Sequence, residues 1–177
     1  MKLTPLAVAG AYVIAGEPRE DARGFFARMF CAEELAAHGL EGRIAQCNLS
    51  WNHARGTLRG MHYQTEPFSE VKIVRCTRGS VYDVVFDVRP DSPTYGKHAA
   101  VTLTAENRLM CYVPRGCAHG YQTLEADCEV FYTVSAPYAP SHERGIRWDD
   151  PAINIAWPVA DPILSPRDQG HPHLVTA

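Results

Sequence analysis

Short segments with the residue alternation of β-strands, separated by turn residues, fill the middle of the chain. The segment VKIVRCTRGSVYDVVFDV at 71–88 alternates β-branched with polar residues around an Arg-Gly-Ser turn, which predicts a β-hairpin. Further segments of this kind, each bounded by Gly, Pro, Asn or Asp, lie at 98–106, 109–116, 120–126 and 128–136. Several strands at such short spacing predict a sandwich or a barrel, and therefore an all-β fold.

One short helix and one irregular arm complete the predicted architecture. CAEELAAHG at 31–39 consists of good helix formers and ends on Gly39, which suits a helix C-terminus. The proline-rich stretch at 149–173 has little periodicity, and we expect it to wrap the surface or to close the mouth of a barrel. A length of 177 residues fits a single domain, which we place at 1–177.

Charge and cysteine content argue against several classes of function. The 17 basic and 20 acidic residues are mixed along the chain and give a net charge of -3, so no basic face for nucleic acid is expected. No apolar window approaches the ~18 residues of a membrane span, and the apolar stretch at 1–16, broken by Pro5, suits a first strand better than a cleaved leader. The 6 cysteines form no Cys-x-x-Cys pair, which favours reduced, mostly buried thiols and a cytoplasmic protein.

The segment RGMHYQ at 59–64 brings polar residues into the predicted core. In an extended strand, Arg59 would point to one face while His62 and Gln64 point to the other. Lys72 lies on the next predicted strand, and an unpaired ammonium group beside a histidine is too costly for an apolar interior. These residues therefore predict a wet cavity lined by polar side chains.

Other segments add polar residues to this cavity. PRGCAHG places His119 where a strand is expected to end in a tight turn, a position from which it can reach a barrel mouth. Alternate residues on one face of the QCNLS segment and two tyrosines of a later segment extend the set: Gln46, Asn48, Ser50, Tyr132 and Tyr138. The joint occurrence of these groups in an all-β chain, rather than any one of them, indicates a functional site.

Two motifs, GTLRGMHYQ at 56–64 and PRGCAHG at 114–120, resemble the two halves of a cupin jelly roll. A longer series is similar to the dTDP-4-dehydrorhamnose 3,5-epimerases, and it comprises DARGFF, QCNLS, LRGMHYQ, VKIVRCTRGSVYDVVFDVRPDSPTYGK, LTAEN, PRGCAHGYQTL and WDDPAINIAWP. This resemblance runs from about residue 21 to residue 168. It implies a cupin jelly-roll β-barrel, and an isomerase that epimerises C3, C5 or both of a nucleotide-linked 4-keto-6-deoxy sugar, with dTDP as the expected nucleotide.

Epimerisation beside a ketone needs a base, a partner for the enolate oxygen and an acid. The resemblance assigns the base to His62, oriented by Asp168, because a carboxylate on one ring nitrogen fixes the tautomer and raises the basicity of the ring. It assigns enolate stabilisation to Lys72, whose positive charge would lie where negative charge develops. It assigns proton donation to Tyr132.

The same resemblance implies a substrate-binding set and a homodimer. Arg23 and Arg59 match residues that contact the diphosphate, where guanidinium groups suit phosphate oxygens. The residues expected around the sugar or the thymidine are Phe26, Gln46, Asn48, His119 and Tyr138. Arg23 and Phe26 are implied to come from the neighbouring subunit of a dimer with exchanged N-terminal strands, which would also cover an exposed sheet edge.

Some positions depart from the pattern of these epimerases. Arg28 stands after the RGFF motif where an acidic residue is frequent. In PRGCAHG, Arg115 replaces a carboxylate and Cys117 replaces an aromatic residue, and Thr133 follows Tyr132 where a lysine is common. We expect these changes to affect which nucleotide or sugar fits, since none removes a proposed catalytic group.

Neither a metal nor another cofactor is expected. Gln64 stands where metal-binding cupins carry their second histidine, and a neutral amide oxygen is a poor transition-metal ligand compared with imidazole. A set of His62, His119 and either Glu66 or Glu70 still leaves a metal-dependent cupin oxygenase open, and His119 leaves a sugar 3,4-ketoisomerase open. A non-catalytic binder of sugar nucleotides is the remaining alternative.

Overall fold

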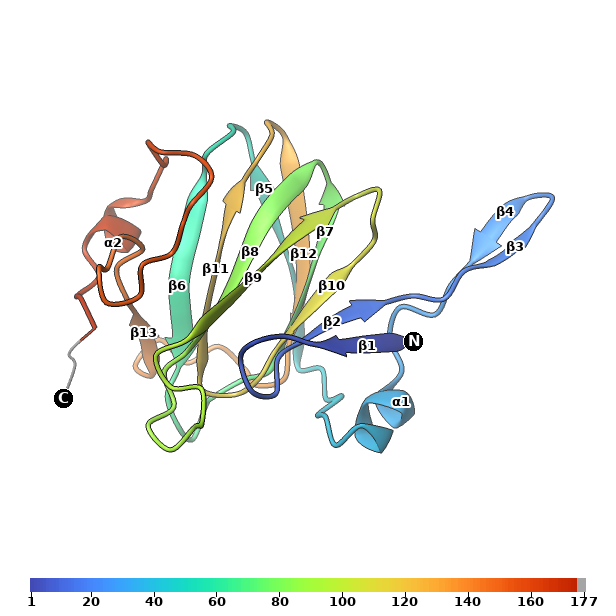
Figure 1. Ribbon diagram of the computed structural model, residues 1–177, viewed down its shortest axis with the longest axis horizontal. Helices are drawn as coiled ribbons and strands as arrows, with labels where there is room; N and C mark the ends of the chain where they lie inside the picture. Colours follow the sequence, from blue (N-terminus) through green and yellow to red (C-terminus); the bar gives the residue numbers. More distant parts are fainter. Residues whose placement is uncertain (175–177) are drawn as a thin grey trace.

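Two facing β-sheets form the body of the protein in the computed structural model, which describes residues 1–174 (Figure 1). The six-stranded sheet contains, in spatial order, β1 (Lys2–Pro5), β2 (Tyr12–Ala15), β10 (Met110–Val113), β7 (Lys72–Arg78), β12 (Cys128–Val134) and β5 (Gln46–Asn52). The five-stranded sheet contains β13 (Glu143–Gly145), β6 (Leu58–Gln64), β11 (Cys117–Thr123), β8 (Ser80–Asp87) and β9 (His98–Thr104). The all-β prediction is confirmed, and residues 175–177 of the predicted single domain lie outside the described part.

Strands β7 and β8 do not form the predicted hairpin. They belong to different sheets, and the turn at Gly79, with a φ of 73°, carries the chain from one sheet to the other. Both strands direct apolar side chains into the same core between the sheets, as Val74, Val81 and Val85 show. Two strands that face each other across a core have the same alternation as two strands of a hairpin, so the pattern alone could not separate these arrangements.

The predicted helix is present as α1 (Ala32–Ala37), outside the two sheets (Figure 1). Gly39 follows it with a φ of 71°, a backbone conformation that favours glycine at a helix end. The fully buried Leu35 packs with Ile14, Ile73 and Tyr112 on the outer side of the six-stranded sheet. Within residues 1–174, no helix combines the length and the apolar character that crossing a membrane requires.

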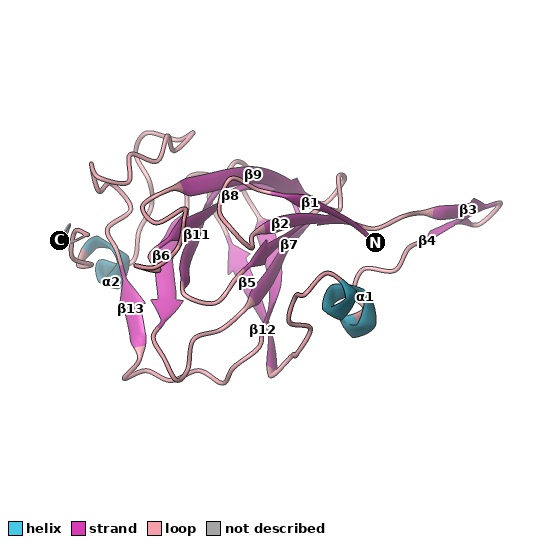
Figure 2. Cartoon of the chain, turned by 60° about the horizontal axis from the view of Figure 1, so that its bottom comes forward, coloured by secondary structure: helices cyan, strands magenta, loops and turns pink. Residues whose placement is uncertain are grey.

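The C-terminal arm is irregular, as expected, and lies along the β6 and β13 side of the five-stranded sheet (Figure 2). Ile153 of the arm and Ile146, which directly follows β13, pack with Met61 and Phe86 on the outer side of that sheet. Near its end the arm forms the one-turn helix α2 (Pro166–Gln169), which Ser165 caps by accepting a hydrogen bond from the Asp168 backbone N–H. Packing of the arm thus fixes the position of α2 beside β6.

A two-stranded hairpin, β3 (Arg19–Asp21) and β4 (Gly24–Phe26), projects from the body (Figures 1 and 2). All residues of both strands are exposed, and 68% of the surface of Phe26 is accessible. Exposed aromatic residues on a projecting hairpin are a feature of surfaces that pack against another chain.

A buried carboxylate after β8 anchors the loop that leads to β9. Asp87 is fully buried and accepts hydrogen bonds from Arg89 Nε at 2.8 Å, from the Ser92 hydroxyl at 2.5 Å and from the Thr94 hydroxyl at 2.6 Å. Burial raises the pKa of Asp87, but the hydrogen bonds from Arg89, Ser92 and Thr94 outweigh it and hold the pKa well below its usual range.

We expect Asp87→Asn to lower the free energy of unfolding at pH 7 by about 3 kcal/mol, because it leaves the Arg89 guanidinium without its buried partner. A carboxyl whose pKa is depressed by folding stabilises above its unfolded pKa and loses this contribution as pH falls toward its folded pKa. The gap between wild type and variant should therefore narrow between pH 5 and pH 3 in urea titrations. A gap that stays constant over this range would contradict the assigned role.

Candidate active site

Strands β6 and β11 lie side by side and carry two histidines that face the space between the sheets. His62 and His119 are partners in the antiparallel register. Farther along, Tyr121 is opposite Arg59. Between these two pairs, β6 therefore contains one residue more than β11. This extra residue is a β-bulge, which turns the side chains that follow it.

The bulge corrects the predicted orientation of Arg59. Strict alternation places Arg59 and His62 on opposite faces, but both line one cavity, because the extra residue lets side chains three positions apart share a face. The strands approach closely here, and a Cβ on Gly60 would lie 2.6 Å from the Cα of Gly120.

The predicted location of His119 at the end of a strand is also wrong. The tight turn ends at Gly116, and β11 begins at Cys117, so His119 lies within the strand rather than in the turn. Its Nε2 is 2.8 Å from Oδ2 of Asp83, a fully buried residue of β8. This contact fixes the orientation of the His119 ring at the cavity wall.

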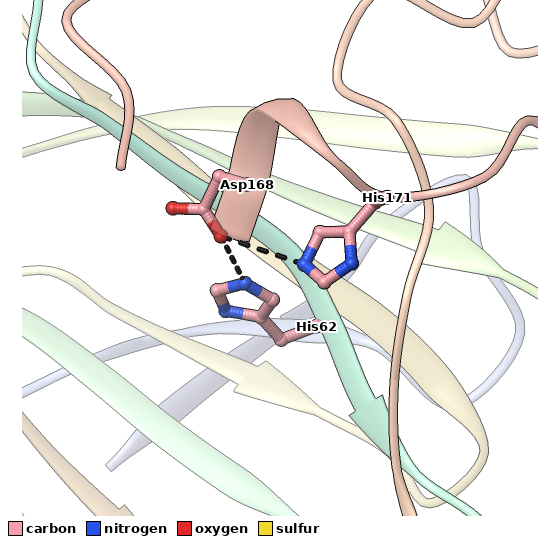
Figure 3. Close-up of side chains that lie close together, drawn as sticks. All are labelled: His62, Asp168 and His171. Atoms are coloured by element: carbon pink, nitrogen blue, oxygen red, sulfur yellow. Dashed lines mark hydrogen bonds and ion pairs between the residues drawn. The ribbon is translucent and has the colours of Figure 1, made fainter. Parts of the chain in front are cut away.

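His62 and Asp168 form a hydrogen-bonded pair (Figure 3). His62 Nε2 lies 2.6 Å from Asp168 Oδ1, and Asp168 is 4% exposed. Burial raises the pKa of Asp168. The hydrogen bond and charge of His62, together with the hydrogen bond from Ser165, lower the pKa by more than burial raises it, so it lies below its usual value. A carboxylate at this position accepts the Nε2 proton and leaves Nδ1 of His62 with a free lone pair.

Lys72 and Tyr132 lie on neighbouring strands of the opposite sheet. Lys72 Nζ is 3.3 Å from Glu70 Oε1 and 3.3 Å from the His62 carbonyl oxygen, so the ammonium group is paired. Burial raises the pKa of the Tyr132 phenol, which therefore keeps its proton at neutral pH. The site combines an imidazole, a paired ammonium group and a protonated phenol.

Two adjoining cavities, of about 300 Å³ and about 360 Å³, meet at these side chains. His62, Lys72 and Tyr132 line both of them. The first cavity is also lined by Arg59, His119, Arg167 and Asp168, and the second by Gln46, Asn48 and Tyr138. The structure thus brings together most of the residues that the sequence singles out, around three groups able to move a proton.

The comparisons with known proteins agree with this geometry. The family model described as dTDP-4-dehydrorhamnose 3,5-epimerase matches residues 5–176. The chain belongs to the dTDP-4-dehydrorhamnose 3,5-epimerase family. A curated member from Sinorhizobium fredii is 42% identical over 175 residues, which cover 98% of this chain and 90% of that protein.

Solved structures of the dTDP-4-dehydrorhamnose 3,5-epimerase family share the whole fold. The Bacillus anthracis enzyme, solved with TDP and PPi bound, has a TM-score of 0.93 and 35% identity, covering 98% of this chain and 99% of that one. The Legionella pneumophila enzyme, solved with dTDP-4-keto-L-rhamnose, has a TM-score of 0.89 and 33% identity, covering 97% and 92%. The jelly-roll prediction and the family resemblance are confirmed.

Two residues that the epimerase resemblance assigns to substrate binding lie apart from the cavities of their own chain. Arg23 and Phe26 belong to the projecting hairpin and line neither cavity. The Arg23 side chain is 90% exposed and pairs with Asp21.

The departures from the epimerase pattern also lie outside both cavities. Arg28 pairs with Glu34 of α1 at 2.8 Å, and Arg115 pairs with Glu41 at 2.7 Å. Cys117 is buried in the core between the sheets. In this chain the changes therefore alter surface ion pairs and core packing rather than the cavity walls.

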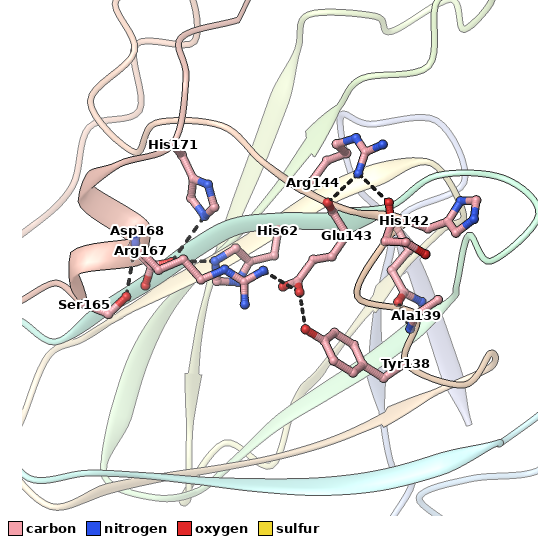
Figure 4. A network of polar contacts seen from close by, with 12 residues as sticks. His62, Tyr138, Ala139, His142, Glu143, Arg144, Ser165, Arg167, Asp168 and His171 are labelled. Atoms are coloured by element: carbon pink, nitrogen blue, oxygen red, sulfur yellow. Dashed lines mark hydrogen bonds and ion pairs between the residues drawn. The ribbon is translucent and has the colours of Figure 1, made fainter.

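Sequence reasoning did not identify Arg167, Glu143 or His171 as neighbours of the site. Glu143 accepts a hydrogen bond from the Tyr138 hydroxyl at 2.5 Å and pairs with Arg167, which joins β13 to α2 (Figure 4). Only Arg167 had a sequence signal, because it directly precedes Asp168. No strand pattern or epimerase motif marks the other two.

Proposed function

We propose that the protein epimerises C3, C5 or both of a dTDP-linked 4-keto-6-deoxy sugar. The observation that carries this proposal is the junction of two cavities at His62, Lys72 and Tyr132 in a member of the epimerase family. Base, cation and phenol are the three groups that inversion next to a ketone needs. No redox change and no added co-reactant enters this reaction.

In the first step, His62 Nδ1 takes the proton from the carbon next to the C4 ketone. The electrons of the broken C–H bond form a C=C bond, and the carbonyl electrons move to the oxygen, giving an enolate. The Lys72 ammonium stabilises this negative charge, and Asp168 stabilises the imidazolium that forms on His62.

In the second step, the Tyr132 hydroxyl gives a proton to the opposite face of the enolate carbon. The C=C electrons form the new C–H bond, the ketone returns, and the configuration of the carbon is inverted. His62 then releases its proton to water and the phenolate regains one. Arg59 is held for the diphosphate by a 2.8 Å hydrogen bond from its Nε to Asn52 Oδ1, which reduces the cost of ordering it on binding.

The proposed activity is tested by incubating dTDP-4-keto-6-deoxyglucose with the protein and following the sugar by proton NMR. We expect a product with inverted C3, C5 or both. A product whose carbonyl group has moved to C3 would instead support a ketoisomerase, and binding of dTDP without any product would support a non-catalytic binder.

The six free cysteines and the buried position of four of them support a cytoplasmic location.

The homodimer is part of this proposal. Arg23 and Phe26 project from the body on an exposed hairpin, which suits insertion beside the cavities of a second copy. Arg23 then supplies the second guanidinium group for the diphosphate, as the family resemblance implies.

A mixing experiment tests whether the hairpin completes a partner's site. We expect Arg23→Ala and His62→Ala to be almost inactive alone, because each lacks one essential group in both sites of the dimer. Random reassociation of equal amounts should restore about a quarter of the wild-type activity, since half the dimers are mixed and each has one intact site. Arg19→Ala, on the same hairpin, is the control and should stay active. Failure of the mixture to regain activity would contradict the exchange.

A further inference from the structure

Three metal-ligand side chains converge beside α2 (Figure 3). One ligand atom from each of His62, Asp168 and His171 lies within 4.8 Å of the others. His171 Nε2 is 3.5 Å from Asp168 Oδ1, the same oxygen that contacts His62. Among residues 1–174, this is the group that has the composition and spacing of a metal site, and it differs from the set of His62, His119 and a glutamate that the sequence left open as an alternative.

His171 has no evident role in the proposed epimerisation. Its Nε2 is buried and has no hydrogen-bond partner, although it points toward the Asp168 carboxylate. The ring is held in place by packing, because it fills the space over Gly145, where a Cβ would overlap with it. A buried imidazole nitrogen without a partner costs free energy unless something else binds it.

We infer that His62, Asp168 and His171 form a binding site for a divalent transition-metal ion, with zinc as the best fit, and that the bound ion inhibits the enzyme. Two imidazole nitrogens and one carboxylate oxygen are a known zinc donor set that leaves a fourth position open. Zinc ligands lie about 2.0–2.2 Å from the ion and hence roughly 3.3 Å from one another. Side-chain rotations would bring the three donors, which now lie within 4.8 Å of one another, to that spacing.

The surroundings permit a cation to enter. The His62 side chain is 27% exposed and lines both cavities, and Asp168 lines the first of them, so an ion can reach these two ligands from the cavity. The nearby cations Lys72 and Arg167 are each paired with a carboxylate, Glu70 and Glu143, which lowers the repulsion that an entering ion meets.

Inhibition follows from the atom that the metal uses. A metal on Nε2 of His62 replaces the proton that Nε2 donates to Asp168, and it places a positive charge on the imidazole that must accept a proton. The metal-bound ring is therefore a weak base. This part of the inference rests on the proposed function, whereas metal binding itself does not.

The test is zinc binding to protein first treated with a chelator. We expect one zinc ion per chain by calorimetry, and a tetrahedral absorption spectrum when cobalt(II) replaces zinc. His171→Gln and His171→Leu each remove one of the three ligands and should weaken binding at least tenfold, since even the loss of a group that only orients a ligand costs that much. His173→Gln is the control, because His173 is a neighbouring, exposed histidine that contacts Asp150 instead.

The activity measurements distinguish a metal ion that inhibits the enzyme from one that the enzyme requires for activity. The chelator-treated protein should be fully active, zinc should inhibit it reversibly, and the His171 variants should need at least tenfold more zinc for the same inhibition. Equal zinc affinity in wild type and both His171 variants would overturn the site. Zinc binding that follows this pattern in a protein without epimerase activity would instead overturn the proposed function and leave the metal site standing.

Discussion

Replacing His62 with asparagine should lower the rate of epimerisation by about 10³–10⁴-fold, in the upper part of the range for loss of a positioned base. Asparagine is similar in size and can keep a hydrogen bond to Asp168, but its side chain cannot accept a proton at neutral pH. The effect should appear in kcat, because the base acts in the transition state, whereas binding of dTDP should change little.

The second cavity histidine provides the matched control. His119→Asn alters a ring that is held by Asp83 and lines the cavity beside His62 on the neighbouring strand, so it should chiefly raise KM. Circular dichroism and thermal unfolding establish that both variants are folded. A loss of kcat that is large for His119→Asn and small for His62→Asn would exchange the assigned roles and contradict the mechanism.

Replacing Tyr132 with phenylalanine should separate the two proton transfers. The base remains, so the variant should still remove the proton next to the ketone and return one to the same face. The acid is lost, so inversion should fall by about 10²–10³-fold. In deuterated water the recovered substrate should gain deuterium while little product forms, and mass spectrometry measures both quantities.

The reason for this separation lies in the position of the phenol. Tyr132 lies on the six-stranded sheet, across the cavities from His62 on the five-stranded sheet, and burial raises its pKa so that it holds its proton. Val134→Ala, also at the wall of the second cavity, controls for a general disturbance of β12. Parallel loss of exchange and inversion in Tyr132→Phe would show that the phenol is needed for the first step as well.

The sequence predicted the elements of the fold better than their pairing. Strand alternation and the residues around Gly39 depend on local backbone geometry, and both the strands and the helix are found near their expected positions. The pairing of β7 and β8 depends on which sheet each strand joins, and the alternation is the same in both cases. The orientation of Arg59 failed for a local reason, since a single extra residue in β6 reverses the alternation.

The residues of the site also differ in how far the sequence could predict them. His62 and Lys72 could be assigned to a cavity from strand positions, because a buried ammonium group is costly unless polar groups or water surround it. Asp168 lies 106 residues from its partner His62, on a helix of four residues, and only the family resemblance indicated it. His171 reaches the same carboxylate through the folding of an irregular arm, which no periodic pattern predicts.

The central claim is that His62 removes a proton from the sugar carbon next to the ketone. Proton NMR of dTDP-4-keto-6-deoxyglucose in deuterated water tests it most directly, because the signals of the exchangeable C3 and C5 protons disappear as the base acts. We predict that the wild-type protein causes loss of the C3 signal, the C5 signal or both, and that His62→Asn causes neither within the same time. Persistence of both signals with wild-type protein, or their loss at equal rates with His62→Asn, would contradict the account.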